Sequence, residues 1–370
     1  MKDVLTRQRW LQIRAIIRLE MRKTFFSKRG LWVYLLALAL PAIFVAHGVI
    51  TSYQHERSRE LASHNERPLT SRDFEAITDG MPRQEVERRL GKASVKYEQH
   101  REEQGEHDKT EAWEEQVSRY SDGSSEYSFA FKDDKLDWTH VRRGDDFAQD
   151  SMHFAATFQF FYLRLVIFFG CLGIFMNLFR GELLDKSLHF YLLAPIRREV
   201  LLAGKYLAGL VATVTIFTTS TALQLFVMGW FVDRNALNNY LTHDHGVTHV
   251  LAYLGITALA CVGYGSVFLA AGLMFRNPIF PAAGILIWES INPFLPALLK
   301  KFSVIYYLKA LCPLNLPSAE GAPPLFALLI SNPDPIAAPV AVAGVLAVSI
   351  LILFLASTNV RRLEINYTTE

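Results

Sequence analysis

Cysteine is scarce in this chain of 370 residues, which contains only Cys171, Cys261 and Cys312. All three lie within or beside apolar segments, so the sequence predicts neither a disulfide framework nor a thiolate metal site. We expect them to be small apolar packing residues.

Motifs for enzymatic chemistry are also missing. The phosphate-binding pattern Gly-x-x-x-x-Gly-Lys-[Ser/Thr] does not occur, so the chain is not expected to hydrolyse ATP itself. Neither His-Glu-x-x-His nor a nucleophile–base constellation is present. The spacing of His243, His245 and His249 matches no strong metal site, so we expect solvated loop histidines and no metal.

Charged residues are absent from long stretches of the chain. Residues 30–50 contain none, and similar apolar blocks cover 154–179, 206–232, 250–275, 278–299 and 337–355. Each block is long enough to cross roughly 30 Å of hydrocarbon as a helix. Buried helices of a soluble fold usually run to only about 10–14 residues. The predicted fold class is therefore an α-helical polytopic membrane protein with six transmembrane helices and an inserted small α+β domain.

The first thirty residues are strongly basic, with nine Lys or Arg against two acidic residues. The positive-inside rule places this end in the cytoplasm, and six crossings return the C-terminus to the same side. A cleaved signal peptide is the alternative, but the basic lead is too long and lacks a convincing cleavage site. We expect an uncleaved first span.

The expected segments follow from this count. The predicted spans are 30–51, 153–179, 204–232, 249–275, 278–299 and 337–358. Residues 1–29 form a cytoplasmic interface helix, 52–152 an extracytoplasmic domain, 180–203 a cytoplasmic loop, 300–336 an outer re-entrant or loop region, and 359–370 a cytoplasmic tail.

Helical periodicity divides the N-terminal segment into an apolar stripe and a basic stripe. These contain Trp10, Ile13, Ile17 and Met21 on one side, and Arg14, Arg18 and Arg22 on the other. Such a helix suits the membrane interface, with its cations toward lipid phosphate. An ordinary solvated basic helix is the alternative.

Residues 52–152 are polar and rich in both signs of charge, and a loop of this length between spans is expected to fold as a domain. Ser71 is positioned to cap a helix over 73–79, and a second helix is predicted over 83–90 between Pro82 and Gly91. Alternation around Tyr127 predicts a half-buried strand.

This polar segment resembles the BamE/SmpA-type lipoprotein domain, in which two helices pack on a three-stranded antiparallel sheet. The likeness implies an extracytoplasmic interaction module, and an unrelated small α+β domain is the alternative. The residues that carry it are Phe74, Ile77, Gly80, Met81, Glu85, Val86, Leu90, Gly91, Asp134, Lys135 and Leu136.

A stretch after the second predicted span is similar to the cytoplasmic loop of type-2 ABC transporter permeases. That resemblance implies an acidic residue that opens a short coupling helix, followed by Pro-x-Arg-Arg before the third span. It implies a permease half that dimerises, binds two separate ATPase subunits carrying ATP and Mg²⁺, and resides in the bacterial inner membrane, most simply in an exporter. The implied ATPase-coupling residues are Glu182, Leu184, Asp185, Leu188, Pro195, Arg197 and Arg198. A basic loop that merely orients the protein is the alternative.

Two ionisable residues lie inside predicted spans. Arg164 and Glu289 are costly there unless paired, protonated or hydrated. A functional pathway and a structural polar anchor are both open for each of them, and no pairing follows from the sequence.

Two other classes of function remain open. A membrane-anchored envelope assembly factor or sensor would work through residues 52–152. A secondary transporter would use Arg164 and Glu289, although no internal repeat supports it. The substrate and the role of the outer domain do not follow from the sequence, and nucleic acid is not an expected partner.

Overall fold

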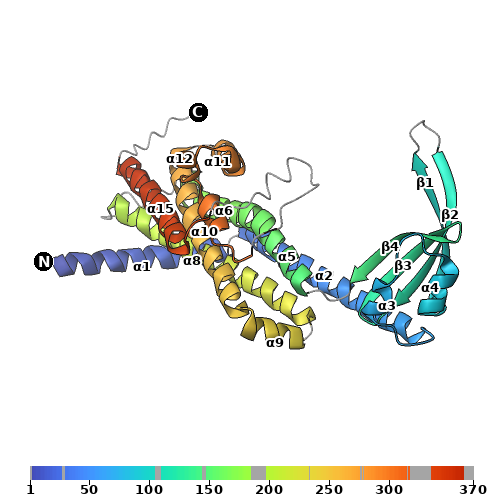
Figure 1. Cartoon of the computed structure of the whole chain (residues 1–370). Helices are drawn as coiled ribbons and strands as arrows, with labels where there is room; N and C mark the ends of the chain where they lie inside the picture. The colour runs from blue at the N-terminus through green and yellow to red at the C-terminus, as the bar shows by residue number, and fades with distance from the viewer. Residues whose placement is uncertain are drawn as a thin grey trace. The chain divides into compact units, whose positions relative to one another are not determined.

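The computed structural model describes residues 2–26, 30–104, 110–143, 147–184, 197–232, 234–275, 277, 279–314, 316 and 335–361. It divides into two compact units (Figure 1). The first, called the membrane unit, comprises Met1–Ile43, Asp150–Val227 and Asn238–Glu370. The second, called the sheet unit, comprises Phe44–Gln149 and Met228–Leu237.

The helical part of the chain follows the apolar blocks of the sequence. Its elements are α1 (Lys2–Phe26), α2 (Leu31–Ser63), α5 (Phe147–Thr157), the π-helix η2 (Phe158–Ile167), α6 (Phe168–Leu184), α8 (Arg198–Phe231), α9 (Arg234–His243), α10 (Gly246–Met274), α11 (Ile279–Ser290), the 3₁₀-helix η3 (Asn292–Phe294), α12 (Ala297–Lys300), α13 (Val304–Ala310) and α15 (Ala338–Arg361).

Five stretches of the described chain are long and apolar enough to cross a membrane. They are Leu31–Ser63, Asp150–Phe179, Arg198–Phe231, Gly246–Met274 and Ala338–Asn359. The predicted count of six spans is not confirmed, because the block at 278–299 is not one continuous helix. Its helix α11 has only 12 residues, or about 18 Å, and ends shortly before Pro293 and Pro296. The chain continues there as η3, α12 and α13.

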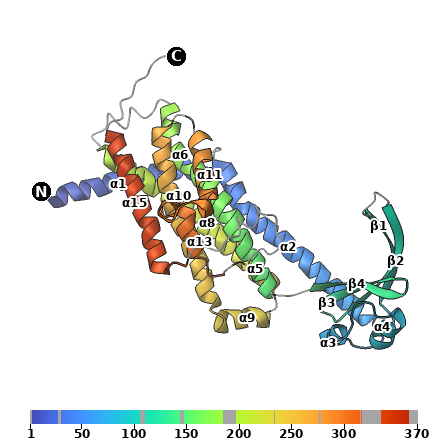
Figure 2. The same ribbon diagram turned by 45° about the horizontal axis from the view of Figure 1, so that its top comes forward.

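Helix α10 packs against α6 and α15 in the membrane unit (Figures 1 and 2). Small residues allow the close approach: a Cβ at Gly265 would lie 2.5 Å from the Phe175 ring, and one at Gly272 would lie 3.1 Å from the Met176 backbone. Small residues at helix contacts are typical of membrane bundles, where close packing replaces the hydrophobic effect as the driving force.

Polar side chains join the helices of this bundle internally. The Tyr162 hydroxyl of η2 donates to the Phe217 carbonyl oxygen at 2.7 Å. The hydroxyls of Thr221 in α8 and Thr257 in α10 lie 3.0 Å apart. These groups are fully buried, so each needs a protein partner.

The sheet unit holds α3 (Ser71–Glu75), α4 (Arg83–Leu90) and a four-stranded antiparallel sheet in the order β1-β2-β3-β4. Its strands are β1 (Val95–Gln104), β2 (Thr110–Ser121), β3 (Ser125–Lys132) and β4 (Lys135–Arg143). The sheet has four strands where the resemblance implied three, and the likeness to the BamE/SmpA-type domain is not confirmed.

Local signals in the sheet unit succeeded in part. Helix α4 has the predicted bounds, and Gly80, between α3 and α4, has a left-handed φ of +79° that glycine adopts without steric cost. The first helix ends at Glu75 and not at residue 79, and Thr70, not Ser71, caps it. Asp73 completes that cap by accepting hydrogen bonds from the backbone and hydroxyl of Thr70, each at 2.8 Å.

One apolar cluster fills the space between α3, α4 and the sheet. Val86, Leu90 and Phe129 are all fully buried, and the rings of Phe74 and Tyr127 stack 3.6 Å apart. The core comprises Leu69, Phe74, Val86, Leu90, Tyr120, Tyr127, Phe129, Phe131 and Leu136.

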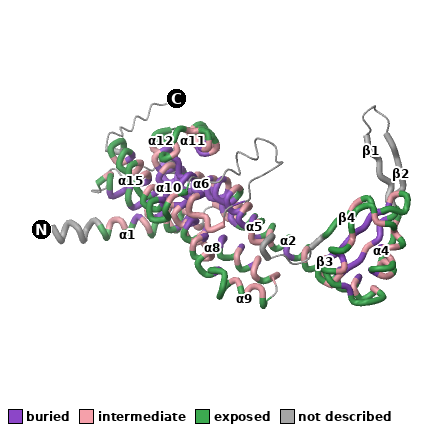
Figure 3. Tube along the Cα trace, in the orientation of Figure 1, coloured by how far each residue is buried: buried purple, intermediate pink, exposed green. Residues whose placement is uncertain are grey.

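Strand β3 is buried over nearly its whole length (Figure 3), whereas the sequence predicted a half-buried strand. The buried Glu126 carboxylate lies 3.3 Å from the Arg119 guanidinium of β2. This ion pair explains how an acidic residue is accommodated on the covered strand.

Candidate functional site

The proposed coupling segment lies between α6 and α8. Glu182 and Leu184 belong to the last turn of α6, and Arg197 immediately precedes α8, where its carbonyl oxygen accepts from the Val200 amide at 2.9 Å. Arg198 opens α8. The other coupling residues, Asp185, Leu188 and Pro195, lie outside the described residues. The coupling role of the whole set remains a prediction.

A buried ion pair lies beside the coupling segment, and the sequence analysis did not identify it. The Lys205 side chain in α8 is fully buried, and its ammonium donates to Glu20 Oε1 of α1 at 2.9 Å. The same ammonium donates to the Leu178 carbonyl oxygen of α6 at 2.6 Å. One side chain therefore joins α1, α6 and α8.

Apolar contact reinforces this three-helix junction. A Cβ at Gly204 would lie 2.9 Å from Ile16 Cγ2, so a larger residue there would force the Ile16 side chain or α1 to shift. The Lys205 ammonium also lies 5.2 Å from the ring centroid of Phe179. Removing one member of a buried ion pair is expensive, which makes the junction a firm mechanical link.

The packed side of α1 differs from the predicted apolar stripe. Over the part of α1 whose side chains the structure describes, Ile16 and Glu20 are buried, whereas Trp10 is 63% exposed. The two predicted stripes therefore do not describe how α1 contacts α8. The junction belongs to a third side of the helix, which carries one acidic and one apolar residue, Glu20 and Ile16.

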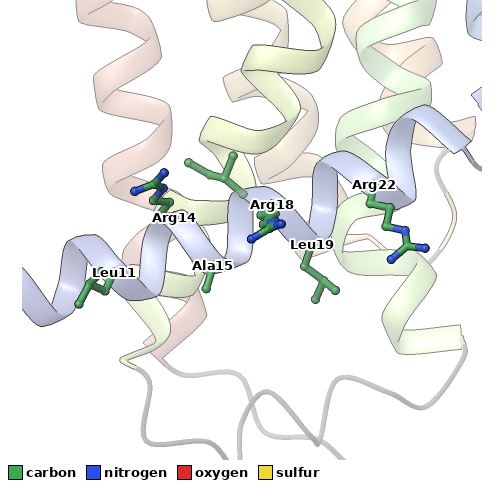
Figure 4. Close-up of a pocket in the computed structure, with 7 residues that line it drawn as sticks. Leu11, Arg14, Ala15, Arg18, Leu19 and Arg22 are labelled. Atoms are coloured by element: carbon green, nitrogen blue, oxygen red, sulfur yellow. The ribbon is translucent and has the colours of Figure 1, made fainter.

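The basic side of α1 borders a hollow of about 920 Å³ (Figure 4). Arg14, Arg18 and Arg22 line it at one-turn spacing, together with the partly exposed Leu11 and Leu19. This mixture of cations and apolar side chains suits a surface facing anionic headgroups. The interfacial location stays a prediction.

The Glu289 carboxylate is hydrogen-bonded to the start of α13. This carboxylate, at the end of α11, accepts hydrogen bonds from the Ser303 hydroxyl at 2.7 Å and from the backbone amides of Val304 and Ile305 at 3.0 and 2.9 Å. It thereby caps the N-terminus of α13, whose first amides have no partner within that helix. Broken helices are tolerated in membranes when such groups are satisfied.

Arg164 does not pair with Glu289. It lies in η2 and is 9% exposed, and the hydrogen bonds of the Glu289 carboxylate within the described chain all come from the start of α13. Among the residues that the structure describes, its guanidinium Nε has no hydrogen-bond partner. A functional pathway and a structural polar anchor both stay predictions for Arg164.

The histidines near α9 do not assemble a metal site. Within the described ranges, no group of three or more His, Cys, Asp or Glu side chains is arranged to hold a metal ion. His249 Nδ1 lies 2.7 Å from the Tyr240 hydroxyl, and His245 holds a left-handed backbone conformation at φ +57°.

Long apolar helices, small-residue contacts and internally satisfied polar groups define an integral membrane protein with several spans. The chain belongs to the family described as ABC-2 family transporter protein, whose sequence model matches residues 14–277, more than two thirds of the chain. It is therefore a membrane permease subunit of an ABC transporter, the component that partners an ABC ATPase subunit and is not itself the ATPase. No curated protein and no solved structure matches the chain.

Proposed function

We propose that this permease subunit is part of an exporter and works as a homodimer with two ATPase subunits, which bind ATP and Mg²⁺. Both termini face the cytoplasm, and residues 52–152 lie outside the bacterial inner membrane. Closure of the ATPase subunits moves residues 180–203, and this movement opens a path between the two permease copies.

The three-helix junction at Lys205 is the observation that carries this proposal. The coupling segment joins α6 to α8, and Lys205 binds α1 and the Leu178 carbonyl of α6 just beyond it. Because separating a buried ion pair is costly, movement of the coupling segment is passed to three helices together. That is the property a force-transmitting subunit requires.

Affinity purification of the tagged chain in mild detergent tests the proposal. We expect an ATPase subunit to co-purify in a stoichiometric amount and the complex to hydrolyse ATP. Folded permease that reproducibly arrives without an ATPase would contradict the proposal.

Introducing charged residues into the coupling segment tests its role in binding the ATPase. Replacing Leu184 and Leu188 by Asp is expected to release the ATPase while the permease remains inserted, because a carboxylate resists burial in an apolar groove. The partly exposed Leu241 of α9 provides the control, as Leu241→Asp should leave co-purification unchanged. Unchanged ATPase recovery from the coupling variant would refute the assignment.

Topology has its own test. A cysteine introduced at Gly105 is expected to react with a membrane-impermeant maleimide in cells with an opened outer membrane and an intact inner membrane. Labelling that requires lysis of the inner membrane would place residues 52–152 in the cytoplasm and overturn the orientation.

A second function is favoured by the independent core of the sheet unit. Val86, Leu90 and Phe129 are fully buried in that core, so the unit has the means to act as an interaction module for an envelope protein, as the BamE/SmpA resemblance implies. In this alternative the chain is an anchored assembly factor or sensor. Deletion of residues 55–150 would then abolish function while the coupling-segment variant would not.

A further inference from the structure

The outward side of α1 carries a row of three cations. Arg14, Arg18 and Arg22 are exposed, and none of them makes a hydrogen bond or ion pair with a residue that the structure describes. Because they follow one another at intervals of four residues, they lie along one side of the helix. Glu20, in contrast, is buried and bound to Lys205. The arginine row therefore has three positive charges available to a ligand.

The arginine row lies opposite the three-helix junction. Arg14 stands two residues before Ile16, and Arg22 two residues after Glu20. Two residues turn an α-helix by about 200°, so these arginines lie on the far side of α1 from the junction. Since Ile16 and Glu20 are the residues that contact α8, the row faces away from that helix.

The side of α1 that carries the row is hollowed and partly apolar (Figure 4). Its hollow of about 920 Å³ is within the range of roughly 300–1,000 Å³ that is typical of small-molecule sites. Leu11 and Leu19, which are 59% and 46% exposed, line it beside the arginines. Clustered cations repel one another and exposed leucines are poorly solvated, but an anionic headgroup above an apolar chain satisfies both.

Two spans fix the level of α1 in the membrane. Only residues 27–30 separate it from the span Leu31–Ser63, so its end lies within about 18 Å of the start of that span. Lys205 lies about 10 Å from the start of α8, which is about 51 Å long and therefore exceeds the roughly 30 Å of hydrocarbon. Both neighbours hold α1 at the end of a span, where lipid headgroups lie.

We propose that Arg14, Arg18 and Arg22 form a binding site for the phosphate headgroups of anionic phospholipids. A guanidinium offers paired N–H donors that match phosphate oxygens, and the two leucines provide apolar surface for the start of the acyl chains. Since α1 is bound to α6 and α8 at Lys205, the lipid is attached to the helices on both sides of the coupling segment. This site goes beyond the proposed function and does not depend on an ATPase.

Binding of a fluorescent short-chain phosphatidylglycerol to the purified full-length chain in a neutral detergent tests this site. Fluorescence anisotropy measures the binding, and the competitors are unlabelled phosphatidylglycerol, phosphatidylcholine of the same chain length, and inorganic phosphate. Phosphatidylglycerol is expected to displace the probe at a concentration at least about tenfold lower than phosphatidylcholine, which carries no net charge.

The competitors also identify the source of the charge. Equal displacement by the two lipids would overturn the proposal, because it would mean that apolar contact alone holds the probe. Displacement by inorganic phosphate at the concentration at which phosphatidylglycerol acts would overturn the assignment to lipid, because a free anion would then suffice.

Charge-removing variants locate the binding. Replacing Arg14, Arg18 and Arg22 together by Gln should weaken phosphatidylglycerol binding about tenfold or more, since each cation near an anionic surface contributes roughly fivefold. Replacing all three by Lys should retain much of the binding. The matched control removes the same charge from exposed cations of the sheet unit and should bind as wild type; it combines Arg72→Gln, Lys135→Gln and Arg234→Gln. Equal binding by the Gln variant and this control would overturn the proposal.

A charge-adding variant keeps the test open if the triple Gln variant does not fold. Ala15 is exposed and lines the hollow, so Ala15→Asp places a carboxylate among the arginines without touching the junction. Its binding of phosphatidylglycerol is expected to be several-fold weaker than that of wild type. Wild-type binding by Ala15→Asp would overturn the proposal.

An acidic surface of a partner protein is the other class of ligand that suits a row of arginines. Co-purification of the ATPase with the triple Gln variant separates the two classes, and we expect it to match wild type in mild detergent. Loss of the ATPase together with unchanged phosphatidylglycerol binding would assign the arginines to a protein interface and overturn the lipid site.

Discussion

The sheet unit and the membrane unit solve opposite problems. In the sheet unit the centre is apolar, with Val86 and Phe129 fully buried. In the membrane unit Phe226 and Phe354 are 62% and 64% exposed, while Lys205 and Gln224 are fully buried. Water drives the first arrangement, whereas a hydrocarbon surrounding favours the second.

The difference has an energetic consequence. The sheet unit depends on apolar contact area, so losing volume from its core is the damaging change. The membrane unit gains little from burying one apolar group rather than another, so breaking a buried polar link is the damaging change there. Variants of each kind can therefore break or sharpen the comparison.

The largest effect is expected at the three-helix junction. Lys205→Met leaves the Glu20 carboxylate buried beside an apolar side chain, and should lower the free energy of unfolding by about 3–5 kcal/mol. Denaturant unfolding in detergent measures it. Lys23→Met is the control, since Lys23 is 50% exposed and lies 3.8 Å from the same carboxylate. Adding Glu20→Gln to Lys205→Met should restore much of the loss, and a failure to restore any would show that packing, not charge, dominates.

The second-largest loss of stability is expected from truncating a core side chain in the sheet unit. Leu90→Ala removes a fully buried side chain of α4 and should cost about 3 kcal/mol. Val141→Ala is the matched control, because Val141 of β4 is 42% exposed and should cost under about 0.5 kcal/mol. Unfolding monitored by a probe within the sheet unit distinguishes them. Equal losses would mean that this core is not the source of the unit's stability.

The cap of α13 is expected to contribute less. Glu289→Ala leaves the Ser303 hydroxyl and two buried backbone amides without their acceptor, and should cost about 2 kcal/mol. Glu289→Gln keeps one carbonyl acceptor and should cost about half as much. Ser290→Ala, next in sequence, removes only a bond to its own helix at Leu286. Thermal unfolding in detergent measures these losses. A lower unfolding midpoint for Glu289→Gln than for Glu289→Ala would contradict the capping role.

Sequence patterns predicted those features of the fold that are determined by residues close together in the chain. Runs without charge located the long helices, and Pro82 with Gly91 gave the bounds of α4 because helix ends have local signals. The break after Ser290 was missed although Pro293 and Pro296 stand there, since the apolar run continues past the helix end. Strand β1 was missed because its sequence is rich in charge and shows no apolar alternation.

Long-range pairs could not be predicted in the same way. Glu20 and Lys205 are 185 residues apart, and nothing near either residue indicates the other. Arg164 and Glu289 were identified as unusual from the sequence, because a charged residue inside an apolar run is energetically costly whatever its neighbours in space. Their different surroundings depend on which elements the fold brings beside them, and that information is not local.

The smallest expected effect is a pH dependence of the stability of the sheet unit. The Thr70 backbone amide and hydroxyl, with the Arg67 guanidinium, hold the pKa of Asp73 below its ordinary value. A carboxyl whose pKa is lowered in the folded state contributes its full stabilisation above its unfolded-state pKa, roughly 4. This contribution is lost as the pH falls through the folded-state pKa. Acidification in that range should lower the unfolding midpoint of the sheet unit, and Asp73→Asn should flatten the dependence. Identical slopes for wild type and Asp73→Asn would show that the cap does not stabilise the sheet unit through its charge.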